Sequence, residues 1–315
     1  MDEGPLEPPP GENVAADIPP PPEIPQPQGA PRNLILVVTA VVVVAVIVVA
    51  AIGYGVVGYA FASSRIAGAR SAYNNVVSHQ NTITESFNTL DTKMTALSLT
   101  TATTADLQQN RTAYAQLVSQ SQSAQPTLVA DDASLATAQA GLKQNSWLTL
   151  IRRSDLDQTS AKIGHERKAL GDAKTIAGDL VQLGTFYQAF YDSLIDLDTL
   201  TTKATASDFV GAAASIGPLK SDITMAIQLS GAPGLPPEMK LFLTDFQTLA
   251  TDVGKLMNAV IGGDTNSVQA DVKAVDADNT KIETYDFSKM SSAIKAFYQP
   301  MIDAFNSEVS IANSM

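Results

Sequence analysis

A run of 32 residues without a charged side chain, residues 33–64, is the strongest hydropathy feature of the chain. It is rich in Val, Ala and Ile. Leu34 to Ile52 alone can cross a hydrocarbon layer of about 30 Å as a helix that rises about 1.5 Å per residue. Tyr54 and Tyr59 follow where an interfacial aromatic belt lies. We therefore predict a single transmembrane helix over residues 33–64.

Beyond this run the apolar positions follow a heptad pattern. Alternating spacings of three and four residues place two rows on one face of a helix that packs against nearly parallel neighbours. We predict one helix from about Leu34 to Leu97, which leaves the membrane and continues into a C-terminal domain of residues 65–315. The first row is Ala69, Val76, Ile83, Leu90 and Leu97, and the second row is Ile66, Tyr73, Gln80, Phe87 and Met94.

Small residues repeat with the same spacing inside the predicted membrane helix, at Ala51, Gly55, Gly58 and Ala62. Such a stripe lets two helices approach closely, which predicts a homo-oligomer through the transmembrane and stalk helix. The same stripe is also compatible with packing against lipid alone. Both interpretations remain open at the level of sequence.

The start of the heptad segment resembles the opening signature of the LemA family, which follows an N-terminal transmembrane helix. The resemblance covers about 22 residues and implies a membrane-anchored antiparallel helical bundle without implying a mechanism. The family's basic pair and its Asp-Leu-Ile-Pro-Asn segment are missing after Met94, and the proline-rich leader is unlike the family. The matching residues are Tyr73, Asn74, Val76, Val77, Asn81, Ile83, Ser86, Phe87, Leu90, Asp91 and Met94.

The rest of the chain has helical periodicity and no convincing period-two strand. We predict an all-α fold in which the single transmembrane helix continues into an elongated antiparallel helical bundle. Proline and glycine divide the expected elements, and Ser154 or Asp155 is expected to cap the longest helix. The expected helices cover residues 105–121, 131–142, 154–203, 208–217, 219–229, 237–261, 267–281 and 288–312, with loops at 122–130 and 231–237 and a kink at Pro300.

We predict that residues 1–32 form a disordered, acidic, Pro-rich tail, because they hold 11 of the 17 prolines, six acidic residues and a single Arg. The tail is either a docking peptide for a proline-recognising protein partner or an extended spacer. Ala60-Phe61-Ala62 resembles a signal-peptidase site, but the acidic leader and the long apolar run favour an uncleaved anchor. The flanking basic residues, Arg32 before the segment against Arg65 and Arg70 after it, weakly favour a cytoplasmic bundle. A large domain behind an N-terminal anchor is usually exported, however, and we expect the bundle on the extracytoplasmic side of the cell membrane.

Composition excludes several classes of function. The net charge of −12 without a basic patch argues against nucleic acid, and the absence of Cys excludes disulfides and thiolate chemistry. His79 and His165 lack a second ligand at the spacing of a helical metal pair, and Asp276-x-Asp278-x-Thr280 lacks the Gly and Glu of a calcium loop. We predict no catalytic residue, no metal site, no cofactor and no enzyme activity.

Two groups of residues are candidates for more than scaffolding. Phe186, Tyr187, Phe190 and Tyr191 lie on one side of a helix, either lining a ligand pocket or packing in the core. Trp147, Arg152 and Arg153 form either a contact for membrane or partner, or a corner that closes the core. Asn110-Arg111-Thr112 is a lone glycosylation sequon that matters only outside the cell.

The sequence as a whole predicts a membrane-anchored helical bundle with a structural or protein-interaction role at the cell envelope. The alternative is an extracytoplasmic ligand-sensing bundle of the chemoreceptor-input type, which signals through the Pro-rich tail or a partner. A single membrane helix and no recognisable output module weaken that alternative.

Overall fold

The computed structural model describes residues 66–80, 103–143 and 153–315, and within these residues the chain is helical with no strand. The all-α prediction is therefore confirmed for this part of the chain. The helices are residues 66–80, α3 (Thr104–Lys143), α4 (Arg153–Thr205), α5 (Phe209–Leu229), α6 (Pro237–Gly262), α7 (Thr265–Glu283) and α8 (Phe287–Ser314).

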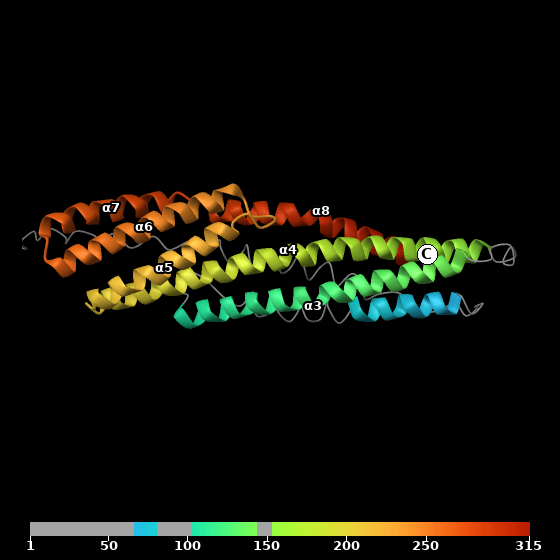
Figure 1. Ribbon diagram of the computed structural model, residues 1–315. Coiled ribbons are helices and arrows are strands. Elements are labelled where there is room, and N and C mark those ends of the chain that lie inside the picture. Colours follow the sequence, from blue (N-terminus) through green and yellow to red (C-terminus); the bar gives the residue numbers. More distant parts are fainter. Residues whose placement is uncertain (1–65, 81–102, 144–152) are drawn as a thin grey trace, which may run out of the picture.

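The described helices form an elongated bundle around α4, the longest of them at 53 residues (Figure 1). α3, α5 and α8 all pack on α4, while α6 packs on α5 and α7 packs on α6. α3 and α4 run antiparallel, since Gln139 near the end of α3 donates a hydrogen bond to the backbone of Ser160 near the start of α4 at 2.8 Å. Helix-on-helix packing along the whole length confirms a helical bundle.

Helix 66–80 confirms the heptad prediction as far as the structure describes it. All five row positions in this range are buried: Ile66, Ala69, Tyr73, Val76 and Gln80. The other row positions, and the predicted membrane segment 33–64, lie outside the described residues. Among the helices that are described, none is both long and apolar enough to cross a membrane.

The predicted loop at residues 122–130 is wrong, because α3 runs unbroken through Pro126. A proline inside a helix costs about 3 kcal/mol relative to alanine. Its ring is exposed here, while a continuous stripe with spacings of three and four remains buried on the opposite face. Packing of that stripe on α4 outweighs the local cost. The buried residues are Ser121, Ala124, Leu128, Asp131 and Leu135.

Two further boundaries, in α5 and at the start of α4, differ from prediction. α5 continues through the exposed Pro218, where two separate helices were expected. α4 begins at Arg153, so Ser154 and Asp155 lie in its first turn and neither is its N-cap.

Other boundaries follow the prediction. Asp208 caps α5 by accepting a hydrogen bond from the backbone N–H of Gly211 at 2.8 Å. Pro237 opens α6, and Gly263 ends it with a left-handed φ of 69° that glycine adopts without steric cost.

The buried side chains form two apolar clusters along the bundle. The larger cluster is rich in aromatic rings and joins α3 and α4 to α5, α6 and α8. The smaller cluster is aliphatic apart from Tyr73 and joins helix 66–80 to the C-terminal part of α3 and the N-terminal part of α4. The first described helix is therefore integrated into the core.

Candidate functional site

A buried polar layer crosses the interface at which helix 66–80 meets the rest of the bundle. Its centre is Glu166 of α4, whose exposed fraction is 0%. Gln80, 2% exposed, donates a hydrogen bond from Nε2 to Glu166 Oε1 at 2.8 Å. The hydroxyl of Tyr73 donates to Asn313 Oδ1 of α8 at 3.2 Å. We call Tyr73, His79, Gln80, Asp131 and Glu166 the polar joint.

A second contact of the polar joint links helix 66–80 to α3. His79 Nδ1 lies 2.9 Å from Asp131 Oδ1, and the Asp131 side chain is almost completely buried whereas His79 is half exposed. The prediction that a helix begins at residue 131 is therefore wrong, because Asp131 lies inside α3 with a buried side chain. Asp132, its neighbour, accepts a hydrogen bond from Arg167 Nε of α4 at 2.7 Å.

Burial controls the electrostatics of the polar joint. Desolvation raises the pKa of the Glu166 carboxyl. The hydrogen bond from Gln80, the nearby Tyr73 hydroxyl and the charge of Lys162 oppose that rise, whereas the Asp131 carboxylate adds to it. Lys162 lies one turn before Glu166 with Nζ 4.8 Å from the centroid of the Tyr73 ring. Desolvation lowers the pKa of Lys162. Protonation of Glu166 is thus more favourable in the bundle than in water.

Two carboxylate oxygens in the polar joint, Glu166 Oε2 and Asp131 Oδ2, are buried without a hydrogen-bond partner among the described residues. A buried unpaired acceptor destabilises a fold unless it takes up a proton or a water molecule. No group of three His, Asp or Glu side chains in the described ranges has the geometry of a metal site. Glu166, whose pKa is raised by burial, is the group of the polar joint at which the surroundings favour uptake of a proton.

The four predicted aromatics occupy the core. Phe186, Tyr187, Phe190 and Tyr191 are essentially buried, and their rings pack on one another. The Tyr187 ring also stacks on Tyr114 of α3, with centroids 4.6 Å apart. These positions match the core-packing interpretation of the four residues. The hydroxyls of Tyr114 and Tyr187 have no hydrogen-bond partner in the described part of the chain.

Most of the other predicted site residues belong to segments outside the described residues. Trp147, Arg152 and the small residues Ala51, Gly55, Gly58 and Ala62 lie outside the described residues. Arg153 is the first residue of α4.

The remaining candidates are placed by described contacts. His165 of α4 contacts Glu308 of α8, with Nδ1 and Oε2 2.5 Å apart. Asn110 lies inside α3 with an exposed fraction of only 3%, so in this fold the sequon does not present its amide for glycosylation.

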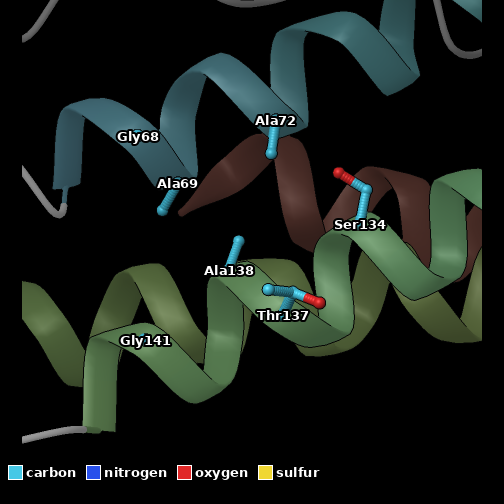
Figure 2. Close-up of a pocket in the computed structure, with 7 residues that line it drawn as sticks. All are labelled: Gly68, Ala69, Ala72, Ser134, Thr137, Ala138 and Gly141. Atoms are coloured by element: carbon cyan, nitrogen blue, oxygen red, sulfur yellow. The ribbon is translucent and has the colours of Figure 1, made fainter.

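A groove of about 430 Å³ lies beside the polar joint, between the start of helix 66–80 and the end of α3 (Figure 2). Only small side chains line it, and Ala69 and Ala138 face each other across the hollow. The full lining is Gly68, Ala69, Ala72, Ser134, Thr137, Ala138 and Gly141.

Comparison of the chain with protein-family models, with curated proteins and with solved structures finds no match.

The polar joint is the site that sequence reasoning missed. Gln80 was a signal for it, as the one polar residue in an otherwise apolar heptad row. Its partners Asp131 and Glu166 carried no such signal.

Proposed function

We propose that this protein is a membrane-anchored helical bundle with a structural or protein-interaction role at the cell envelope. One observation carries the proposal. Helix 66–80 begins two residues after the predicted membrane segment and is a packed member of the bundle, with every heptad position from Ile66 to Gln80 buried. A membrane helix continuous with this element would hold the bundle rigidly to the bilayer.

Contacts in three directions support a rigid attachment. Helix 66–80 reaches α3 through His79, α4 through Gln80 and α8 through Tyr73. Displacement of the helix relative to the bundle would break polar contacts and expose apolar surface together. The bundle and the membrane helix would therefore move as one rigid body. A spacer, or a platform for a protein partner, requires such rigidity.

The predicted partners fit this role. The Pro-rich tail of residues 1–32 would face the opposite side of the membrane from the bundle and offer a peptide to a proline-recognising protein. The small-residue stripe at Ala51, Gly55, Gly58 and Ala62 would allow a homo-oligomer within the bilayer. The likeness to LemA proteins, which rests on residues 73–94, is consistent with the same architecture.

Alkaline carbonate extraction of membranes tests whether residues 33–64 anchor the chain in the bilayer. We expect the full chain to stay in the membrane pellet after alkaline carbonate treatment and to need detergent for release, whereas a chain lacking residues 33–64 is released without detergent. A variant that lacks residues 1–32 serves as the control and should stay in the pellet. Release of the full chain by carbonate would contradict the proposal.

A second candidate function is a sensor, and the unpaired oxygens of Glu166 and Asp131 favour it. A change of protonation inside the polar joint would alter how tightly the bundle holds the helix that leads to the membrane. Hydrogen exchange of the backbone amides of residues 66–80 distinguishes the two candidates. A sensor predicts exchange that changes with pH beyond the intrinsic chemical effect, whereas a static scaffold predicts none.

A further inference from the structure

The groove separates the start of helix 66–80 from the end of α3. A Cβ atom built on Gly68 or on Gly141, one on each side of the groove, would meet nothing within 4 Å. Ala69 and Ala138 face each other across the hollow (Figure 2). The distance between packed helices depends on the size of the side chains at the contact, and small ones let the two backbones approach closely. The start of helix 66–80 therefore has room to move toward α3.

The other end of helix 66–80 is held by the polar joint. Gln80 donates its hydrogen bond to Glu166, and His79 contacts Asp131. Glu166 Oε2 and Asp131 Oδ2 are buried here without a hydrogen-bond partner among the described residues. Ionised Glu166 therefore carries a buried charge that is only partly stabilised by hydrogen bonds, and a water molecule at Oε2 would stabilise it further. Ionisation favours a wider interface at this end of the helix, and protonation favours a closed one.

Charged groups face Glu166 from α3, from α4 and from helix 66–80. The Asp131 carboxylate of α3 disfavours ionisation of Glu166, whereas the charge of Lys162 of α4 favours it. His79 of helix 66–80 contacts Asp131. Arg70 of the same helix repels Lys162. Desolvation has a larger effect than any of these charges, and it raises the pKa of Glu166.

α8 meets the polar joint through an uncharged contact. Its Asn313 accepts a hydrogen bond from the hydroxyl of Tyr73. Its Glu308 contacts His165, the residue before Glu166. With these groups in place, the raised pKa of Glu166 sets the direction of the effect. Stabilisation of the closed joint is complete below about pH 4.3 and is lost as the pH rises through the folded-state pKa.

The middle of helix 66–80 provides a pivot, because Tyr73 and Val76 are buried in the smaller apolar cluster. Gln80 lies seven residues after Tyr73, or about 10 Å along the helix, and Gly68 lies five residues before it, or about 8 Å. A water molecule between Gln80 and Glu166 would widen that contact by about 3 Å, which is one hydrogen-bond length. A rigid helix that pivots at Tyr73 would then move Gly68 by about 2 Å in the opposite direction. The groove provides space for this movement.

We propose that helix 66–80 rocks about Tyr73 between two positions, and that protonation of Glu166 selects between them. In the first position, which the structure shows, the polar joint is closed and the groove is open. In the second position Glu166 is ionised, water enters the polar joint and the start of the helix lies closer to α3. The inference rests on the second candidate function, because it states how a change of protonation in the polar joint reaches the helix end beside the predicted membrane segment.

Distances between spin labels in the full chain measure this movement, since the chain has no Cys of its own. One label is placed at Ala67→Cys, near the start of helix 66–80, and the other at Ala140→Cys, near the end of α3, because both positions are exposed. In lipid vesicles, with the labelled chain diluted by unlabelled chain, we expect the distance to be about 2 Å shorter at about pH 8 than at about pH 5. Glu166→Gln stays neutral and should keep the longer distance at both pH values.

Gly141→Leu fills the groove, so it should also keep the longer distance at both pH values. Gly171→Leu is the matched control, because Gly171 is an exposed glycine of α4 outside the groove whose built Cβ also meets nothing within 4 Å. This variant should behave like the wild type. If Gly141→Leu loses helical circular dichroism, Gly68→Leu fills the same groove from the facing helix.

A second label pair reports on the rest of the bundle. Ala140→Cys with Ala161→Cys spans α3 and α4 beside the hydrogen bond between Gln139 and Ser160, so its distance should not change with pH. An equal distance at both pH values for the first label pair in the wild type would overturn the proposal. The sensor function would still stand in that case if hydrogen exchange of residues 66–80 changes with pH. A shift that persists in Glu166→Gln would also overturn the proposal, because another group would then drive the movement.

Discussion

The contact between Gln80 and Glu166 yields the sharpest prediction about stability. Gln80→Leu removes the 2.8 Å hydrogen bond to a carboxyl group that has no exposed surface. A hydrogen bond to a charged group contributes about 1.5–3 kcal/mol, and the leucine recovers about 1 kcal/mol through burial of apolar surface. The expected net loss in the free energy of unfolding is about 0.5–2 kcal/mol at neutral to alkaline pH.

The loss should depend on pH. Burial raises the pKa of Glu166 in the folded chain above its value of about 4.3 in the unfolded chain. Such a group contributes stability that is complete below about pH 4.3 and is lost as the pH rises through the folded-state pKa. Gln80 lowers that folded-state pKa, so its removal raises it further. Gln80→Leu should therefore destabilise more at about pH 8 than at about pH 5.

Urea unfolding of the full chain in detergent, followed by circular dichroism at both pH values, measures this. Glu166→Gln removes the buried charge but keeps a polar partner for Gln80, so it should leave stability unchanged or raise it by about 1 kcal/mol at about pH 8. Ser121→Ala is the control, since it removes a buried hydroxyl without a partner among the described residues and should show no dependence on pH. A pH-independent effect of Gln80→Leu, or an equal loss from Glu166→Gln, would refute the reasoning.

Further predictions use matched pairs in the same unfolding assay. Tyr187→Phe removes a buried hydroxyl that has no partner in the described residues and should be neutral or slightly stabilising, whereas Tyr298→Phe loses a 3.0 Å hydrogen bond to a backbone carbonyl and should cost about 1 kcal/mol. Gly263→Ala forces a side chain into a left-handed conformation and should cost about 1 kcal/mol, whereas the adjacent helical Gly262→Ala should be neutral or stabilising. Asp208→Ala removes the N-cap of α5 and should cost about 1 kcal/mol. Equal effects within either pair, or no effect at Asp208, would contradict the corresponding structural reason.

Hydrophobic periodicity predicted best where large apolar residues dominate. The heptad rows of helix 66–80 and the aromatic residues of α4 were found from the sequence because each buried position carries a recognisable apolar side chain. The prediction failed along α3, where the buried stripe includes Ser121, Ala124 and Asp131 and has little hydrophobic contrast. Pro126 then became the strongest local signal and was wrongly taken as the end of a helix.

The polar joint was hidden for a different reason. Asp131 and Glu166 are 35 residues apart, on two different helices, and each is an ordinary acidic residue of a helix when the sequence is read alone. Only tertiary packing brings them to the buried face of helix 66–80, where their charge becomes costly. Of the site residues that the sequence did propose, the aromatic group of α4 belongs to the core, and the group around Trp147 remains a prediction.

The side of the membrane on which the bundle lies tests the proposed envelope role most directly. The chain has no Cys, so a single introduced Cys is the only thiol of the chain that a maleimide can label. Ala15→Cys reports on the Pro-rich tail, and Ala206→Cys reports on the exposed turn between α4 and α5. Intact cells that produce each variant are treated with a membrane-impermeant maleimide. A membrane-anchored bundle outside the cytoplasm predicts labelling at Ala206→Cys in intact cells and at Ala15→Cys only after permeabilisation. Labelling of Ala15→Cys alone in intact cells would place the bundle in the cytoplasm and contradict the account.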